Sequence, residues 1–478
     1  MRNDYVLVVD MERTQEIAQT AFPGGTANIV SRERRVAMGK ALRDKIPRKQ
    51  HSQWTAAKGR PNLIDILRAM DAGRMKELVP IRYSRMLQSP FSFYRGAAEI
   101  MASDLAQIAN TDLRVQACGD CHLMNFGGFA TPERNIIFDI NDFDETLPAP
   151  WEWDVKRLAA SIALAARAIG LSDGNARDST VTSARSYREH MRELSRLDPL
   201  QVWYTEITVR DFIGALPKAI RKRVLKHIDK AALQSGSELD YPKLAETVSG
   251  QIRITDHPPL IFHPEASRAP EFQEEREQIF QTYRETLPED RRMLLDRYHV
   301  VDAAIKVVGV GSVGRRCWIA LLMSENNDPL FLQFKEAVES VLEPYTGKSA
   351  YSHHGQRVVI GQRLMQPVSD IFLGWMTDPN GRQFYVRQLH DAKIKPMIET
   401  FNAEMLDDYA RACGWALAHA HSKISEISPT ISGYLGSSEE FDVAMGKFAL
   451  TYADQVECDY AAFRTAVREG KITACQDS

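Results

Sequence analysis

Residues 118–127 of the chain read CGDCHLMNFG, and they follow a short apolar stretch, Leu113 to Ala117, that predicts a strand. Glycine and small polar residues after a strand predict a tight loop. Within such a loop, Asp120 and Asn125 can face the same cleft. The carboxylate of Asp120 can orient or deprotonate a hydroxyl, and the amide oxygen of Asn125 can bind Mg²⁺.

A second polar run, FDINDFDE at residues 138–145, follows a predicted strand at Asn135 to Ile140. Four carboxylates in so few residues repel one another, and a bound divalent cation relieves that repulsion. The alternative is an acidic surface turn stabilised by Asx hydrogen bonds. We refer to residues 118–125 as the Asp120 loop and to residues 138–145 as the acidic segment.

The glycine segment, VGVGSVG at residues 308–314, matches the pattern G-x-G-x-x-G. This pattern occurs in dinucleotide-binding folds and in the glycine-rich loops of kinases. A dinucleotide fold needs a helix directly after the glycines, but residues 315–322 (RRCWIALL) predict a strand. A strand on each side favours the kinase arrangement, in which backbone amides lie over the ATP phosphates. An ordinary glycine hairpin is the alternative.

Lys335 ends the next apolar strand, LQFK at residues 332–335. A lysine there can reach the α- and β-phosphates of a nucleotide. Glu336, Glu339 and Glu343 follow at spacings of three and four, which predicts one helix face. One of these glutamates could form an ion pair with Lys335, and we assign this role to Glu339. The alternative is that the three glutamates form a solvated acidic face.

Two cysteine and histidine patterns are weaker. Cys118 and Cys121 form a C-x-x-C next to His122, but no second C-x-x-C completes a zinc site. His353-His354 and the pair at 419 and 421 suit surface or packing roles.

Composition sets the broad class. The chain has 478 residues, 44% hydrophobic and 26% charged, with a net charge of −3, and these are globular values. The charge argues against a nucleic-acid protein that depends on bulk charge. Six scattered Cys do not form a disulfide scaffold. The best apolar helix, Leu158 to Leu171, is interrupted by Arg167, and the N-terminus lacks a long apolar run, so we expect a reduced, cytoplasmic protein without a membrane span.

Periodicity predicts helices before and after a cluster of strands. Residues up to about 60 are basic and predict a solvated helix and an arm. The remaining expected elements are helices in Asn62 to Asn110 with a break at Ser89-Pro90, a helix at Trp153 to Ile169, strands at Ala303 to Val308, Cys317 to Met323, Asp328 to Phe334, Arg357 to Leu364 and Ser369 to Trp375, and a helix at Leu406 to Ile424.

The Asp120 loop resembles a known catalytic loop. Gly119-Asp120-x-His122-x-x-Asn125 is similar to the His-Gly-Asp-x-His-x-x-Asn loop of aminoglycoside phosphotransferase-type kinases, with Cys118 in place of the first His. In those kinases a metal motif like Asp-Phe-Gly-Asp precedes an Asp at a helix start by twelve residues. Asp142 and Asp154 have that interval here, so the resemblance favours Asp142 as metal ligand, with Asp139 as the alternative.

The order of these motifs is unusual, because the glycine segment and Lys335 come after the Asp120 loop. Residues 410–422 resemble the helix that normally precedes the catalytic loop. The resemblance therefore implies an α+β, two-lobed, protein-kinase-like fold in circularly permuted order. The implied parts are an N-terminal extension (1–89), a large, mostly helical lobe (90–299, completed by 393–478) and a small antiparallel-sheet lobe (300–392).

The chain also resembles a bacterial family designated domain of unknown function 2252, over about residues 80 to 460. The matching stretches are LVPIRYSRM at 78–86, SPFSFYRG at 89–96, the Asp120 loop, NDFDET at 141–146 and GQRLMQ at 361–366. This family supplies no reaction to carry over.

The kinase resemblance implies ATP- and Mg²⁺-dependent phosphoryl transfer to a hydroxyl of an unidentified small molecule or protein. Its implied site residues are catalytic Asp120 and His122; Asn125 and Asp142 for Mg²⁺; and Gly309, Gly311, Ser312, Gly314, Lys335 and Glu339 for ATP.

Three other functions stay open at this point. They are AMP transfer by the same site, a nucleotide-binding pseudokinase, which Cys118 favours, and a dinucleotide oxidoreductase. Arg82, Arg85 and Arg95 lie near the Asp120 loop in sequence; one could stabilise a transferred phosphate, or all could form structural ion pairs.

Overall fold

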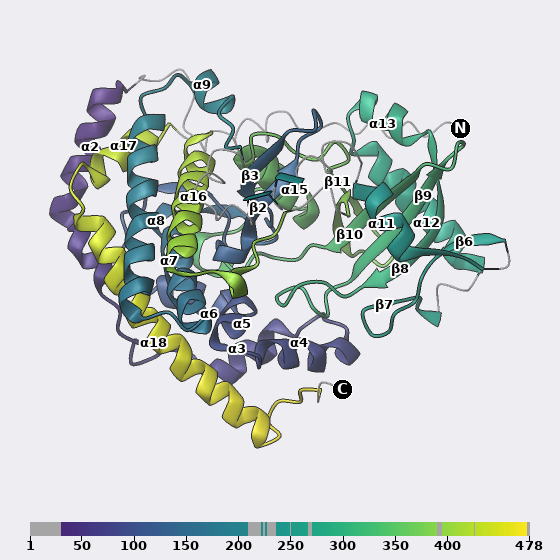
Figure 1. Cartoon of the computed structure of the whole chain (residues 1–478), viewed down its shortest axis with the longest axis horizontal. Coiled ribbons are helices and arrows are strands. Elements are labelled where there is room, and N and C mark those ends of the chain that lie inside the picture. Colours follow the sequence, from purple (N-terminus) through teal and green to yellow (C-terminus); the bar gives the residue numbers. More distant parts are fainter. Residues whose placement is uncertain are drawn as a thin grey trace, which may run out of the picture.

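The computed structural model describes residues 30–208, 221–222, 225–226, 236–248, 250–265, 270–389, 394–424 and 426–475. Helices gather in one part of the molecule and a sheet dominates the other (Figure 1). Every strand pair among the described residues is antiparallel. The predicted mixed α+β class with antiparallel sheets is therefore confirmed.

The helical part is built from both ends of the chain (Figure 1). Its early elements are α2 (Arg32–Lys45), η1 (Arg48–Ser52), α3 (Leu63–Met70), η2 (Lys76–Leu78), α4 (Val79–Met86), α5 (Pro90–Arg95) and α6 (Ala98–Leu105). Then come α7 (Trp151–Ala168), α8 (Asp173–Leu194) and α9 (Pro199–Trp203). Its late elements are η7 (Ile398–Thr400), α16 (Ala403–Ser422), α17 (Ser428–Leu435) and α18 (Glu440–Arg468).

Helix α7 is the centre of this part. All but its last two residues are buried, as expected for a helix with neighbours on every side. Helices α8 and α18 pack along it, and α16 packs on α8. The predicted helices at 153–169 and 406–424 are thus confirmed within a few residues.

The basic N-terminal region forms a helix, as predicted, but α2 is not wholly solvated. It packs on α17, and Arg43 donates to the backbone oxygen of Tyr434 at 2.9 Å. The expected arm before residue 30 lies outside the described residues.

Two small two-stranded sheets hold the polar loops. Strand β1 (Arg114–Ala117) pairs with β4 (Leu147–Pro150), and β2 (Phe126–Ala130) pairs with β3 (Ile136–Ile140). The Asp120 loop joins β1 to β2, and the acidic segment leaves the end of β3. The backbone N–H of Asn141 donates to the carbonyl oxygen of Asn125 at 2.7 Å, so these two polar runs lie side by side.

The large sheet has the order β11-β12-β10-β9-β8-β7. Its strands are β7 (Ile261–Phe262), β8 (Tyr298–Lys306), β9 (Cys317–Ser324), β10 (Pro329–Glu336), β11 (Gly374–Thr377) and β12 (Gln383–Gln388). The glycine segment connects β8 to β9, so a strand and not a helix follows it. The three strands predicted at 303–334 are confirmed.

Two predictions around this sheet are wrong. Residues 357–364 form part of helix α15 (His354–Met365) and not a strand; His353 caps the helix by accepting the N–H of Gln356. Glu336, Glu339 and Glu343 do not share a helix face. Glu336 ends β10, and the short helix α14 (Glu343–Thr346) begins only at Glu343. The strand predicted at 369–375 overlaps β11 only at its last two residues.

Elements before residue 300 also belong to the sheet part. They are α11 (Gly236–Leu244), β5 (Ala245–Val248), β6 (Gln251–Ile254), α12 (Pro270–Glu285) and α13 (Glu289–Leu295). Tyr283 and Leu287 pack in one apolar cluster with residues of β9, β10 and β12. The sheet part therefore starts earlier than the predicted boundary at 300, because β7 is hydrogen-bonded to β8. Within the described ranges, we find no helix with the length and apolar character of a membrane span.

Candidate functional site

A cleft of about 580 Å³ opens where the helical part meets the large sheet. Three polar segments line it: the Asp120 loop, the acidic segment and the glycine segment. They are far apart in the chain, so the fold alone brings them together. The residues that line the cleft include Asp120, His122, Asn125, Asp142, Asp144, Glu145, Gly309, Gly311, Ser312 and Glu339.

Asp154 of α7 holds the Asp120 loop through hydrogen bonds to its backbone. Its carboxylate accepts the backbone N–H groups of Cys118 at 2.6 Å and of Gly119 at 3.0 Å. Gly119 has a φ of +84°, which glycine adopts without strain. His421 of α16 lies with its Nε2 at 3.2 Å from the same carboxylate. Buried side chains of α7 and α16 thus fix the conformation of the loop.

Asp120 is oriented by Arg157, three residues after Asp154 on α7. The Nε and Nη2 atoms of Arg157 donate to Oδ1 of Asp120 at 2.9 and 2.7 Å. Asn125 donates through its amide nitrogen to the backbone oxygen of Asp120 at 2.6 Å. The Asp120 side chain remains 21% exposed, so a carboxylate with a fixed direction faces the cleft.

His122 lies beside this carboxylate, with Nε2 at 3.9 Å from Oδ2 of Asp120. Burial lowers the pKa of His122 to about 3, against the opposing effect of Asp120. The imidazole is therefore neutral at physiological pH. It can donate or accept one hydrogen bond in the cleft, but it does not add a positive charge there.

Lys335 connects the large sheet to the acidic segment. Its Nζ lies 2.7 Å from Oδ2 of Asp144 and 3.6 Å from Oδ2 of Asp142. The hydroxyl of Tyr385, on β12, donates to the other oxygen of Asp144 at 2.6 Å. Burial works to raise the pKa of Asp144, but Lys335 and Tyr385 outweigh it and hold that pKa at about 2. Burial and the charge of Asp144 raise the pKa of Asp142.

The structure separates the two candidate metal ligands. Asp142 lines the cleft, whereas Asp139 is buried in β3 and is not among the lining residues. Oδ1 of Asp139 accepts the N–H of Ile140 at 2.7 Å, and burial raises the pKa of Asp139 to about 8. Asp142 is thus the candidate that points to the site.

The glycine segment forms one wall of the cleft, and arginine side chains from the helical part hold it through hydrogen bonds to its carbonyl oxygens. Gly309 and Gly314 have φ values of +62° and +87°. Arg74 donates to the carbonyl oxygens of Gly311 and Val313 at 2.9 and 2.5 Å. Arg85 bonds to the carbonyl oxygen of Gly309. Gly314 is outside the set of lining residues, and its oxygen accepts the N–H of Met75 at 2.8 Å.

Glu339 does not reach Lys335. It lines the cleft but pairs with Lys348 at the surface, where its side chain is 46% exposed. The predicted Glu339–Lys335 pair is therefore absent. The residues after β10 turn away from the strand, and Asp144 occupies the position beside Lys335 instead.

The donor set suits a hard cation. Asn125, Asp142 and Asp144 all line the cleft and carry side-chain oxygen atoms, and Mg²⁺ is bound in proteins by one or two carboxylates together with waters and phosphate oxygens. The described residues hold no group of three or more His, Cys, Asp or Glu side chains that could bind a metal alone. A cation here would take its remaining ligands from a nucleotide or water.

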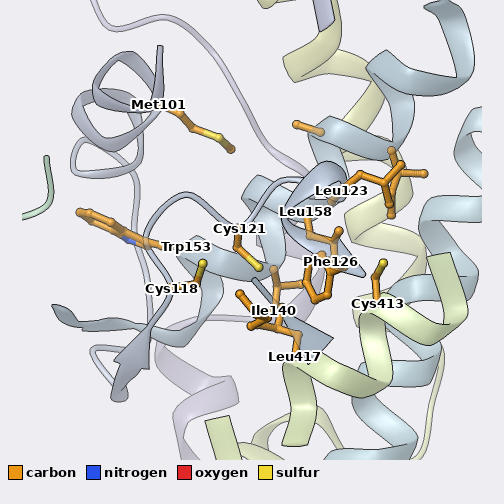
Figure 2. Packing of buried hydrophobic residues seen from close by; sticks show 14 of the residues in the cluster. Met101, Cys118, Cys121, Leu123, Phe126, Ile140, Trp153, Leu158, Cys413 and Leu417 are labelled. Carbon is orange, nitrogen blue, oxygen red and sulfur yellow. The ribbon is translucent and has the colours of Figure 1, made fainter. Parts of the chain in front are cut away.

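The C-x-x-C pair lies in the apolar core. Figure 2 shows Cys118 and Cys121 among Leu123, Ile140 and Leu158. The Cys121 thiol works to lower the pKa of Cys118, but burial and nearby carboxylates raise it to about 11. Protonated, buried thiols are poor metal ligands and poor nucleophiles.

Sequence reasoning missed several residues at the cleft. Arg157 has a partial signal, because it lies one helical turn after Asp154. Asp144 belongs to the acidic segment, but the sequence pattern does not separate it from the neighbouring carboxylates. Tyr385 and Arg74 have no local signal, since each reaches the site through tertiary contacts.

The comparisons with known proteins give one family. No curated protein and no solved structure matches the chain. A family model described as "Uncharacterized protein conserved in bacteria (DUF2252)" matches residues 74–466. That range covers most of the chain and all three segments that line the cleft. The chain therefore belongs to this bacterial family.

Proposed function

We propose that the cleft transfers a phosphoryl group from ATP, with Mg²⁺, to a hydroxyl of a small molecule or protein. The main support is the meeting of the Asp120 loop, the acidic segment and the glycine segment in one cleft. In kinases the glycine-rich loop covers the phosphates and the phosphate-binding lysine is on the third strand. Here the glycine segment joins β8 to β9, and Lys335 is on the next strand, β10. The fold we propose is two-lobed, kinase-like and circularly permuted.

On the donor side, the backbone of Gly309, Gly311 and Ser312, which line the cleft, would cover the phosphates. Lys335 would exchange part of its contact with Asp144 for the α- and β-phosphates. Asn125 and Asp142 would hold Mg²⁺, with Asp144 available as a further oxygen ligand. The bound cation supplies charge neutralisation on the phosphate oxygens.

On the acceptor side, Asp120 is the base. Its Oδ1 is occupied by Arg157, so Oδ2 is the oxygen available to the acceptor hydroxyl. The hydroxyl oxygen forms the new bond to the γ-phosphorus as its proton passes to Asp120. The bond from the γ-phosphorus to the bridging oxygen breaks, and ADP leaves with that electron pair.

Replacing the base tests this assignment. We expect Asp120→Ala to lower Mg²⁺-dependent ADP formation on the order of 10²-fold or more, because general-base catalysis contributes about that much. ATP binding, measured by thermal shift with ATP and Mg²⁺, should persist. Asp178→Ala, an exposed carboxylate on α8, is the matched control. Equal turnover in Asp120→Ala and in the wild type would remove Asp120 from the mechanism.

Product analysis and ATP binding distinguish phosphoryl transfer from the alternative functions. Mass spectrometry of the product separates addition of phosphate from addition of AMP. ATP binding without turnover in the wild-type protein would indicate a pseudokinase. A dinucleotide oxidoreductase has less support, because β9 follows the glycine segment where that fold needs a helix.

A further inference from the structure

Arg95, the last residue of α5, is an unusual cation in the cleft. It lines the cleft, and its Nε is buried without a hydrogen-bond partner. Across the described residues, no carboxylate oxygen lies within 4 Å of its guanidinium. Its aromatic neighbour is Phe91, whose ring centroid is 5.7 Å from the guanidinium carbon. A guanidinium with unused donors is costly to hold partly buried unless something else binds it.

The other described arginines that line the cleft have partners; Arg315, for example, donates to the backbone oxygen of Ala72 at 3.1 Å. Arg74 holds the glycine segment, and Arg157 holds Asp120. Arg82 pairs with Asp71 at 3.0 Å and donates to the oxygen of Gly96 at 2.8 Å. Arg82 and Arg85 thus make structural contacts. Arg95 is the member of this group that lines the cleft.

Arg95 lies close to both the glycine segment and Asp120. Its backbone oxygen is 3.4 Å from the point that a Cβ on Gly311 would occupy, so α5 ends against the glycine segment. A Cβ added to the next residue, Gly96, would lie 3.2 Å from Cγ1 of Val310, so this residue also lies against the glycine segment. Asp120 is also near: burial lowers the pKa of Arg95, and the charges of Asp120 and Glu399 partly offset this.

We propose that Arg95 contacts the phosphoryl group during its transfer and stabilises the charge on its equatorial oxygens. This assignment rests on the proposed phosphotransferase function and adds a catalytic residue to it. Arg95 gives up no proton in the step; it donates hydrogen bonds to oxygens that belong neither to the breaking nor to the forming bond. Positively charged groups placed at such oxygens lower the barrier most, because charge is spread over them in the transition state.

A transition-state mimic tests this role without knowledge of the acceptor. The complex of ADP, Mg²⁺ and fluoroaluminate mimics the transition state of phosphoryl transfer. The complex of ADP and Mg²⁺ alone mimics the product complex. The affinity of each would be measured by calorimetry for the wild type, Arg95→Gln and Arg95→Lys. Arg177→Gln, which removes an exposed arginine on α8, is the matched control. Circular dichroism shows whether each variant is folded.

We expect fluoroaluminate to tighten ADP binding to the wild type and the control on the order of 10²-fold, and to tighten it less than about tenfold in Arg95→Gln. The affinity for ADP alone should stay within about threefold, and the rate of ADP formation from ATP should fall about 10²–10³-fold with little change in KM. Arg95→Lys should recover part of both losses, because it keeps the charge but not the planar donor pair. A purely structural role would not separate the two ligands.

The contrary outcomes are distinct. Full tightening by fluoroaluminate in Arg95→Gln would overturn the role of Arg95 and leave the phosphotransferase proposal standing. Equal loss of ADP and fluoroaluminate binding would make Arg95 a ground-state or structural residue. A wild-type protein that binds no ADP or ATP with Mg²⁺ would overturn the proposed function itself.

Discussion

Asp154 is a buried residue whose effect reaches the cleft through the backbone. Both of its oxygens accept N–H groups of the Asp120 loop, and His421 approaches the same carboxylate. Hydrogen bonds to a charged acceptor are stronger than neutral ones. Asp154 therefore sets the direction in which the loop presents Asp120, although it does not line the cleft.

The substitution Asp154→Asn should be disruptive despite its equal size. An amide has only one acceptor oxygen, so its NH₂ group would face one of the two N–H donors. Leaving a buried N–H unpaired costs about 1–3 kcal/mol. We expect the free energy of unfolding in urea to fall by that amount. Asp178→Asn, at the surface of α8, should change it by less than about 0.5 kcal/mol. Equal stability of Asp154→Asn and the wild type would contradict this account of the loop.

At the scale of elements, helices α8 and α16 share an extensive contact. Gly414 of α16 faces the backbone of α8, and a Cβ added there would collide with the carbonyl oxygen of Ser183. The missing side chain lets the two helices approach closely, which brings His421 of α16 to Asp154 of α7.

Gly414→Ala should therefore destabilise the protein, although alanine is the better helix former. Overpacking costs about 1–3 kcal/mol, more than the roughly 1 kcal/mol gained in helix propensity. The control is Gly174→Ala in the first turn of α8, where the nearest atom would be 3.5 Å away. We expect that control to be neutral or slightly stabilising. Thermal unfolding of both variants measures the difference, and a higher Tm for Gly414→Ala would show that the helices can separate freely.

A second element contact depends on pH. His263, just after β7, lies 2.8 Å from Asp256 and 3.1 Å from Asp302 of β8. The hydrogen bond to Asp302 raises the pKa of His263, against the effect of burial. The charged form is thus favoured in the folded state. Its contribution to stability is fully present below the unfolded pKa of about 6.5 and is lost as pH rises through the folded value.

Urea unfolding of the wild type and His263→Gln at two pH values tests this contact. The wild type should exceed the variant in stability by more at pH 6 than at pH 9, because only the protonated imidazole gains from both carboxylates. Thr247→Ala, at an exposed position on β5, should show no such change. A stability difference that is the same at both pH values would mean that the pair does not titrate as described.

At the scale of the whole molecule, local patterns predicted the strands β8, β9 and β10 and the helix α7, because their apolar residues follow one period without interruption. They failed at α15. Arg357 to Leu364 was predicted to be a strand, but Val358 and Val359 are buried on a helix that His353 caps. Composition cannot show which residues will pack on which neighbour.

Some residues of the candidate site could also be predicted from local motifs, and others could not. Asp120, Asn125 and Asp142 have short-range motifs, and all three line the cleft. The partner of Lys335 could not be predicted from spacing, because Asp144 reaches it from a segment far away in the chain. Arg95 and Arg157 likewise gain their roles only when α5, α7 and the loops assemble.

The order of the elements along the chain has a consequence for synthesis. Helices α7 and α8 leave the ribosome early, but α16, α17 and α18, which cover them, come last. A nascent chain must therefore carry the apolar faces of α7 and α8 uncovered while the entire sheet part is being made. Exposed apolar surface of this kind favours aggregation and recruits chaperones. The contact between His421 of α16 and Asp154, which supports the Asp120 loop, can form only after α16 has left the ribosome.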